Sequence, residues 1–232
     1  VEEVKPGDPT GLYEMIEQLA FKAQIPTPKT YIIPDHSPNA FATGRNPNHS
    51  AVAVTEGLLG AMTSQELEAV LAHEIGHIVN RDTLISCIAA TLASAIMFLA
   101  NMAKWAALFG GHTYSGHSRH GDRERGGSAI QLLLMVIVAP LAATLVQFAI
   151  SRSREFIADS TGAKLCGNPE WLANALRKIH HLSMAYPLAE GQPATAHLYI
   201  INPFSGNAII NLFSTHPPVE ERIKRLLMIR PH

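Results

Sequence analysis

Leu71-Ala72-His73-Glu74-Ile75-Gly76-His77 is the stretch of this sequence that decides the fold. In a helix, residues i and i+4 lie on one face, so His73 and His77 can direct their imidazole nitrogens at a common point. Two such imidazoles suit a zinc ion, and Glu74 can then act as general base toward a water molecule at the metal. Because so short a pattern also occurs by chance on ordinary helices, its flanks matter.

The residues around this motif favour a helix that contains it. Thr63 and Glu66 form a T-x-x-E capping box at the expected start. Apolar residues then recur at helical spacing, namely Leu67, Val70, Leu71, Ile75 and Ile78. The motif is therefore expected in the middle of a helix, where its geometry requires it to be, and the sequence predicts a metal hydrolase.

Composition limits the class of protein. The 232 residues carry a net charge of −1 and no basic run that would follow a phosphate backbone, so no nucleic-acid partner is expected. Cys87 and Cys166 provide neither a disulfide framework nor a thiolate metal site, which favours a reducing compartment. The chain begins at Val1 with neither methionine nor a signal-like stretch, so we expect further sequence upstream.

Two uncharged stretches account for a high hydrophobic content of 47%. Residues 83–102 carry no charged side chain, and residues 128–150 form a second run of similar length. About 20 apolar residues cross a hydrocarbon core of roughly 30 Å as a helix. Helices of a soluble bundle are the alternative, but they would show a polar stripe, which these runs lack. We expect a transmembrane hairpin over residues 83–150 with a polar loop at 110–127, whose orientation the charges do not fix.

A hairpin returns the chain to the side that it left. We therefore expect one catalytic domain in two parts, residues 1–82 and 151–232, with the hairpin 83–150 inserted between them. A catalytic zinc needs three protein ligands and an open position. Glu155 and Asp159 share a helical face, so one can bind zinc while the other holds a ligand histidine by its second ring nitrogen. A solvated carboxylate pair is the alternative.

Extended segments and further helices complete the predicted fold. Three segments predict a small sheet, namely 29–33, 39–43 and 51–54. The other segments with a regular pattern are helical, so the predicted class is α+β and mostly helical. His216 and Arg222 lie at the start of the last helix, where residues of these types face solvent by default.

Four motifs together resemble one family. They are NAFATG at 39–44, HEIGH at 73–77, SRSREFIAD at 151–159 and STHPPVEERI at 214–223. The chain resembles the HtpX family of bacterial membrane metallopeptidases and, more distantly, the type 1 CAAX prenyl protease. The resemblance implies a gluzincin-like zinc metallopeptidase domain with an inserted transmembrane hairpin and one Zn²⁺ per chain. It also implies two further membrane helices before Val1.

The resemblance also assigns roles to single residues. It implies that Glu74 is the base, that Asp159 holds a ligand histidine, and that the zinc ligands are His73, His77 and Glu155. It favours an exposed edge strand that binds the substrate backbone through Asn39, Ala40, Phe41 and Ala42, whereas an internal strand is the alternative from sequence alone. Finally, it supports His216 and Arg222 as donors to the negative oxygen that develops on the substrate carbonyl, with either able to be the main donor.

The activity implied by the resemblance is a membrane-bound zinc endopeptidase. It would hydrolyse misfolded or unassembled membrane proteins in quality control, from a multi-pass position in the bacterial inner membrane with the active site facing the cytoplasm. Expected partners are protein or peptide substrates and the lipid bilayer, and no oligomeric state is predicted. An alternative from another class is a catalytically idle membrane scaffold or chaperone-like protein that keeps zinc for folding. The presence of Glu74 argues against it, because a structural site needs no base.

Overall fold

A computed structural model describes residues 1–109, 138–185 and 217–230 of the chain. They divide into two compact units, Val1–Ile85 with Ser151–His232, and Ser86–Ile150. The predicted polar loop 110–127 and the predicted substrate-oxygen donor His216 lie outside the described residues. The first unit contains the sheet and the motif helix, and the second contains the apolar parts of two long helices.

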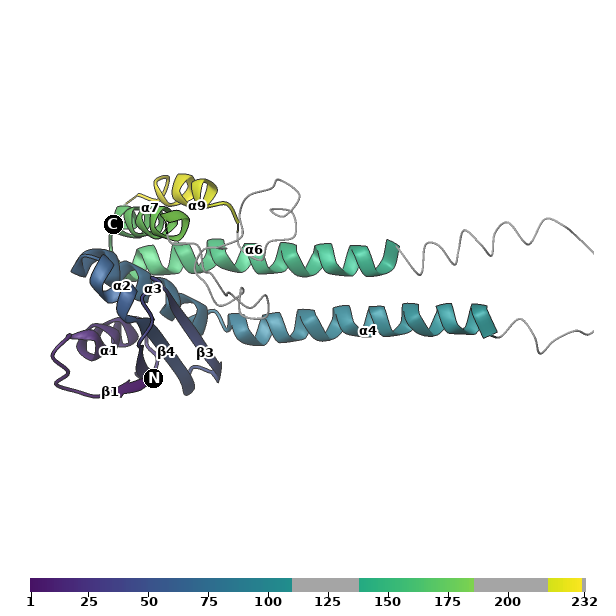
Figure 1. Ribbon diagram of the computed structural model, residues 1–232, viewed down its shortest axis with the longest axis horizontal. Coiled ribbons are helices and arrows are strands. Elements are labelled where there is room, and N and C mark those ends of the chain that lie inside the picture. Colours follow the sequence, from purple (N-terminus) through teal and green to yellow (C-terminus); the bar gives the residue numbers. More distant parts are fainter. Residues whose placement is uncertain (110–137, 186–216, 231–232) are drawn as a thin grey trace, which may run out of the picture. The chain divides into compact units, whose positions relative to one another are not determined.

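The first unit contains a mixed sheet with strand order β1-β2-β4-β3. Its strands are β1 (Glu2–Val4), β2 (Lys29–Ile33), β3 (Ala40–Asn46) and β4 (His49–Thr55). β2 runs parallel to β4, whereas β1 and β3 pair antiparallel with β2 and β4. The three predicted strands are confirmed, and β1 was not predicted. β3 lies at an edge of the sheet rather than inside it (Figure 1).

Helices pack on this sheet through a shared apolar core. They are α1 (Leu12–Lys22), the short α2 (Glu56–Ala61) and α3 (Ser64–Val79), which carries the histidine motif. The predicted capping box begins α3, since the Thr63 hydroxyl accepts from Glu66 N at 3.3 Å and the Glu66 carboxylate accepts from Thr63 N at 2.8 Å. Val52, Val54 and Ile75 are among the fully buried residues of this core. α3 is therefore a buried helix held between the sheet and the helices that follow.

Three later helices complete the described chain, α6 (Ala139–Cys166), α7 (Pro169–Ala185) and α9 (Val219–Leu226). α6 is continuous through residue 150, where the sequence suggested a boundary between hairpin and catalytic domain. It packs very closely on α3, because a Cβ added at Gly162 would lie 2.8 Å from the backbone nitrogen of His73. Only glycine permits this approach, which brings the acidic residues of α6 to the histidines of α3.

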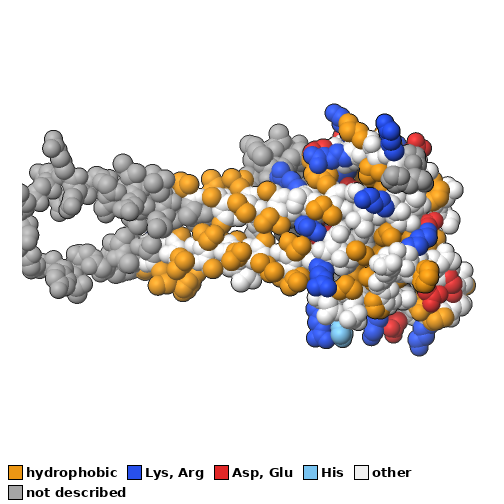
Figure 2. All heavy atoms as spheres, turned by 180° about the vertical axis from the view of Figure 1, so that it is seen from behind, with side chains coloured by type: hydrophobic (Ala, Val, Ile, Leu, Met, Phe, Trp, Pro, Cys, Tyr) orange, Lys and Arg blue, Asp and Glu red, His pale blue; other side chains and the backbone are white. Residues whose placement is uncertain are grey.

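The second unit has an inverted distribution of apolar side chains. Helix α4 (Asp82–Phe109), which enters this unit after its first turn, exposes large residues, among them Leu92 (61%), Phe98 (64%) and Leu99 (62%). The apolar residues buried in the described part of this unit are Ala89, Ala93, Ala100 and Ala143. Within the described residues, Asp82–Met102 is long and apolar enough to cross a membrane, and 17% of its apolar window is buried. Figure 2 shows hydrophobic side chains over the surface of these helices, the reverse of a soluble bundle.

Candidate metal centre

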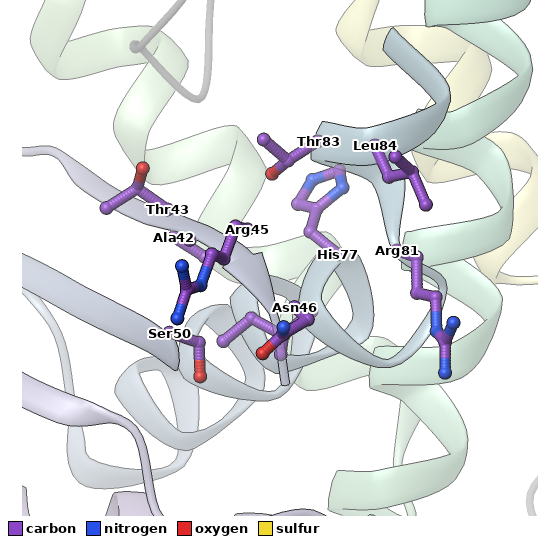
Figure 3. A pocket seen from close by; sticks show the side chains of 11 residues that line it. Ala42, Thr43, Arg45, Asn46, Ser50, His77, Arg81, Thr83 and Leu84 are labelled. Atoms are coloured by element: carbon purple, nitrogen blue, oxygen red, sulfur yellow. The ribbon is translucent and has the colours of Figure 1, made fainter. Parts of the chain in front are cut away.

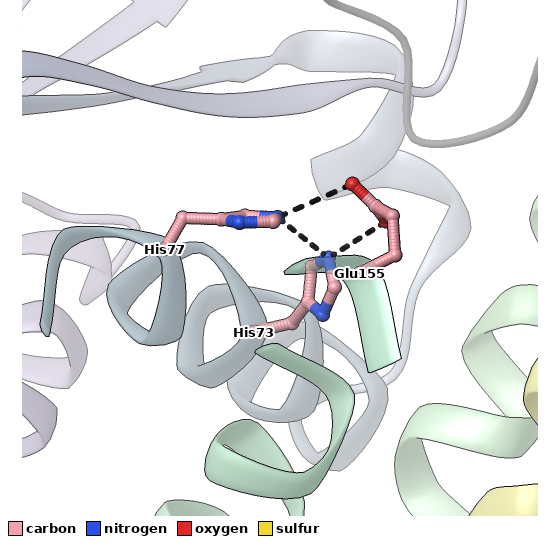
Figure 4. A group of neighbouring side chains, drawn as sticks. All are labelled: His73, His77 and Glu155. Atoms are coloured by element: carbon pink, nitrogen blue, oxygen red, sulfur yellow. Dashed lines mark hydrogen bonds and ion pairs between the residues drawn. The ribbon is translucent and has the colours of Figure 1, made fainter. Parts of the chain in front are cut away.

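His73, His77 and Glu155 converge at one point between α3 and α6 (Figure 4). The two Nε2 atoms lie 3.1 Å apart, and each lies 3.7 Å from an oxygen of Glu155. A four-coordinate zinc with bonds of about 2.0–2.2 Å places its ligand atoms roughly 3.4 Å from one another. Two imidazoles and one carboxylate are also a donor set that zinc accepts. The spacing and the chemistry of this cluster therefore fit one zinc ion.

Asp159 and Arg222 lie behind the first of these histidines. His73 Nδ1 is 3.0 Å from Asp159 Oδ1, and Arg222 donates to both oxygens of Asp159 at 2.6 and 2.9 Å. Burial alone would raise the pKa of Asp159, but the charge of Arg222 and the contacts with His73 and Arg222 together lower that pKa to about 2. Asp159 is therefore a carboxylate that lies against the ring on one side and accepts from the guanidinium on the other.

Arg222 does not face solvent, so the default expectation for it was wrong. Its side chain is 1% exposed, and Nη1 lies 3.2 Å from Glu155 Oε2. Nη2 also lies 3.3 Å from His73 Nε2, which places the guanidinium close to the point where the three donor atoms meet. Its role as donor to a substrate oxygen stays a prediction, and so does that of His216.

His77 has a buried partner that the sequence analysis missed. Its Nδ1 lies 2.7 Å from Oδ2 of Asp82, the first residue of α4, and Arg154 donates from Nε to Asp82 Oδ1 at 2.5 Å. Burial lowers the pKa of His77, but the hydrogen bond with Asp82 and the charges of Glu155 and Glu74 raise it to about 9. These carboxylates favour a cation at this ring. An aspartate soon after the histidine motif was the only sequence signal for the contact.

Glu74, the predicted base, is buried beside the cluster and touches the sheet edge. It is 4% exposed, and burial raises the pKa of its carboxyl group. Its Oε2 accepts the backbone N–H of Ala42 on β3 at 2.9 Å. This hydrogen bond joins the predicted base to the predicted substrate strand, and nothing in the sequence pointed to it.

The predicted substrate residues lie on β3 and just before it. Asn39 and Ala40 are buried, whereas Phe41 and Ala42 are half-buried. Because the Ala42 N–H points away from β4 and antiparallel ladders alternate, the backbone groups of Ala40 also face the outer edge of β3, which pairs with no other described strand. The edge position was predicted, while the binding of substrate there stays a prediction.

A pocket opens beside His77, between β3 and the turn that leads from α3 into α4 (Figure 3). His77 and Ile78 from α3 form part of its wall. The other lining residues are Ala42, Thr43, Gly44, Arg45, Asn46, Ser50, Arg81, Thr83 and Leu84. The sequence analysis did not predict this pocket, because it combines residues of 42–50 with residues of 77–84, and α2 and most of α3 lie between these two segments.

Comparisons with known proteins found relatives over nearly the whole chain. Several curated relatives carry the name "Protease HtpX homolog". That of Desulfatibacillum aliphaticivorans is 53% identical over 229 residues, which cover 99% of this chain and 72% of that protein. That of Pyrococcus furiosus is 54% identical over 219 residues, which cover 94% of this chain and 73% of that protein. The resemblance to the HtpX family is therefore confirmed.

One solved structure resembles nearly the whole fold, and one family description matches nearly the whole sequence. The crystal structure of Ste24p from S. mikatae is similar with a TM-score of 0.59 and 24% identity, over 97% of this chain and 51% of that one. The chain thus spans about half the length of that protein, and at this identity the likeness concerns the fold alone. The description "Peptidase family M48" matches residues 8–230. The chain therefore belongs to peptidase family M48.

Proposed function

We propose that the chain is a membrane-bound zinc endopeptidase in which His73, His77 and Glu155 bind one Zn²⁺. The observation that carries this proposal is the convergence of three donor atoms within 4.8 Å of one another, beside a buried carboxylate. When bound, zinc would supply Lewis-acid chemistry by polarising a water molecule and the scissile carbonyl.

Glu74 acts as general base in this proposal. Its Oε2 is held by the N–H of Ala42 at 2.9 Å, which fixes the carboxylate beside the cluster. From there it takes a proton from the attacking water and returns it to the leaving amine. Asp159 holds His73, and Arg222 offsets part of the negative charge of Asp159 and Glu155 in addition to its predicted donation to the substrate oxygen.

The substrate binds along β3 as an added strand. The outer edge of β3 beside Glu74, which pairs with no other described strand, offers the carbonyl of Ala42 and the backbone groups of Ala40, which suits an extended peptide of any sequence. The pocket beside His77 accepts one substrate side chain next to the metal. Recognition of backbone rather than of particular side chains fits a protease that acts on misfolded or unassembled membrane proteins, as the relation to HtpX proteases suggests.

The membrane part of the proposal concerns residues 83–150. They form a transmembrane hairpin inserted into a gluzincin-like domain whose two parts are residues 1–82 and 151–232. The exposed large apolar residues of α4 and the apolar start of α6 support it. The protein is then multi-pass in the bacterial inner membrane, with its active site facing the cytoplasm.

The test is a cleavage assay with detergent-purified protein and casein as a loosely folded substrate. We expect cleavage that a chelator abolishes and that added zinc restores. Zinc-loaded, folded protein that leaves casein intact under all conditions would contradict the proposal and support the idle zinc-stabilised scaffold. Equal cleavage before and after complete removal of the metal would instead exclude a metal-dependent mechanism.

A further inference from the structure

We propose that Asp82 and Arg154 form a positioning pair that holds two of the three metal ligands at once, His77 directly and Glu155 through the helix that carries both Arg154 and Glu155. The inference rests on the proposed metal site and adds two residues that act through its ligands. Both residues belong to the first compact unit, although the bond between them spans 72 positions of the sequence.

The contact between Asp82 and His77 fixes the ring. Asp82 is 5% exposed, and its Oδ2 lies 2.7 Å from His77 Nδ1. A neutral histidine that donates its Nδ1–H to a carboxylate presents the lone pair of Nε2, and its ring cannot rotate away. Nε2 is the His77 atom that lies 3.1 Å from His73 Nε2 and 3.7 Å from Glu155 Oε1. Asp82 therefore selects both the tautomer and the direction that the metal site needs.

Arg154 fixes Asp82 in turn. Its Nε donates to Asp82 Oδ1 at 2.5 Å and its Nη2 to the carbonyl of Asn80 at 3.3 Å. Asn80 is the C-cap of α3, where a cation is favoured by the helix dipole. One planar guanidinium thus joins the end of α3 to the first residue of α4. Asp82 uses one oxygen for the histidine and the other for the arginine, so neither contact can shift without the other.

The same pair sets the third ligand. Arg154 and Glu155 are consecutive on α6, so their side chains point about 100° apart around the helix axis. With Arg154 directed at Asp82 and Asn80, Glu155 faces the two histidines. A rotation of α6 that moved Glu155 away from the metal would break the Arg154 contacts first.

The pair also lies at the base of the inserted segment. Asp82 begins the helix that becomes the apolar stretch, and Arg154 lies four residues after Ile150, where the chain returns to the first unit. The bond between Asp82 and Arg154 therefore helps to bring Glu155 of α6 to the two histidines of α3. Arg154, 72 positions after Asp82, can therefore act on His77 of α3 through Asp82.

The test measures metal binding in the full chain, purified in detergent. Zinc affinity is determined by competition with a chelator of known affinity, and the geometry of the site by the visible absorption spectrum of the Co²⁺-substituted protein. We expect Asp82→Ala to weaken zinc binding about ten- to a hundred-fold and to change the Co²⁺ spectrum. Arg154→Ala should also weaken zinc binding. Arg154→Lys should bind zinc more tightly than Arg154→Ala but less tightly than the wild type, because lysine keeps the positive charge but cannot donate from two nitrogens of one planar group.

A double variant decides whether the two residues act as a unit. Asp82→Ala with Arg154→Ala should be little worse than Asp82→Ala alone, since both changes remove one network. Lys164→Ala, an exposed cation on α6, serves as control and should bind zinc like the wild type. If Asp82→Ala does not fold, zinc affinity and the Co²⁺ spectrum of Arg154→Ala and Arg154→Lys are compared with those of the wild type instead.

Wild-type zinc affinity and Co²⁺ spectrum in both Asp82→Ala and Arg154→Ala would overturn the inference, while the proposed function would stand. Strictly additive losses in the double variant would show two independent residues rather than a pair, and would also overturn it. A wild-type chain that binds no zinc would contradict the proposed function itself, so the two failures are distinguishable.

Discussion

At the scale of single residues, a change at Glu74 tests the catalytic step without removing a zinc ligand. It is buried beside the three ligands but is held by Ala42 rather than by the ligand set. Glu74→Gln keeps an acceptor for the Ala42 N–H and removes the base. We expect normal zinc content and a loss of about a hundred- to ten-thousand-fold in kcat.

The control for this change is Glu68→Gln on the same helix, where Glu68 forms a partly exposed pair with Lys22 at 3.4 Å. It should cleave casein at the wild-type rate. Metal analysis and initial rates check both variants, and near-normal turnover in Glu74→Gln would move the base elsewhere.

Arg222 gives a second prediction at this scale. A donor that acts only on the transition state would leave stability unchanged when removed, which is the outcome expected from the sequence. The contacts with Asp159 and Glu155 change that expectation, because Arg222→Ala leaves two buried carboxylates without their arginine. We expect a loss of about 3–5 kcal/mol in the free energy of unfolding, measured by chemical denaturation.

Lys224→Ala, an exposed change on the same helix α9, should leave the free energy of unfolding within measurement error. Unchanged stability together with a large fall in kcat for Arg222→Ala would show that substrate donation is its main role.

At the scale of elements, the closest packing lies between α3 and α6. A Cβ at Gly162 would meet the backbone of His73 at 2.8 and 2.9 Å, and a backbone cannot rotate aside as a side chain does. Gly162→Ala should therefore separate the two helices, with a loss of about 1–3 kcal/mol in stability and weaker zinc binding.

Gly60→Ala is the matched control, because nothing lies within 4 Å of a Cβ built there. Its helix α2 should keep or gain a little stability, since alanine is favoured over glycine in helices. Thermal denaturation with and without zinc compares the two. A Gly162→Ala protein as stable as Gly60→Ala would contradict the close packing of α3 on α6.

The long helices give a prediction about the membrane. α4 exposes Leu92, Phe98 and Leu99 over a stretch that carries no charge from residue 83 to residue 102. Such a surface is stable in hydrocarbon and aggregates in water. We expect the chain to stay in the membrane fraction after a carbonate wash and to require detergent for release. Release of monomeric protein by carbonate alone would show that these residues form a soluble core.

At the scale of the whole molecule, the proposed metal site joins two segments that are far apart in the sequence. Two ligands come from α3 and the third from α6, and the whole of the second unit lies between them in the sequence. A metal that binds only the folded chain stabilises it by about 2.7 kcal/mol when its free concentration is a hundred times Kd. Chelation should therefore lower Tm, and added zinc should restore it.

Glu155→Ala provides the control for this linkage, because it removes the ligand from α6 and leaves the pair on α3. Its Tm should respond much less to chelator or to zinc. An equal Tm with and without metal in the wild type would mean that the ion does not join the two segments.

The sequence by itself determined everything that depends on neighbours along the chain. The i, i+4 spacing aligns His73 with His77, and the Thr63 capping box starts their helix where it was predicted. Three of the four strands and the apolar character of residues 83–102 also follow from local patterns. These features need only backbone geometry and composition, so no knowledge of the packing is required to predict them.

Only the tertiary structure decided which distant groups meet. It brings Glu155 to the cluster and Asp159 to the outer nitrogen of His73, a choice that their shared helical face left open. It buries Arg222 where the sequence suggested solvent, and it pairs Asp82 with His77 and Arg154. These contacts depend on how closely α6 approaches α3 at Gly162 and on where the inserted segment closes. Both are set by packing between segments far apart in the sequence, which no local pattern records.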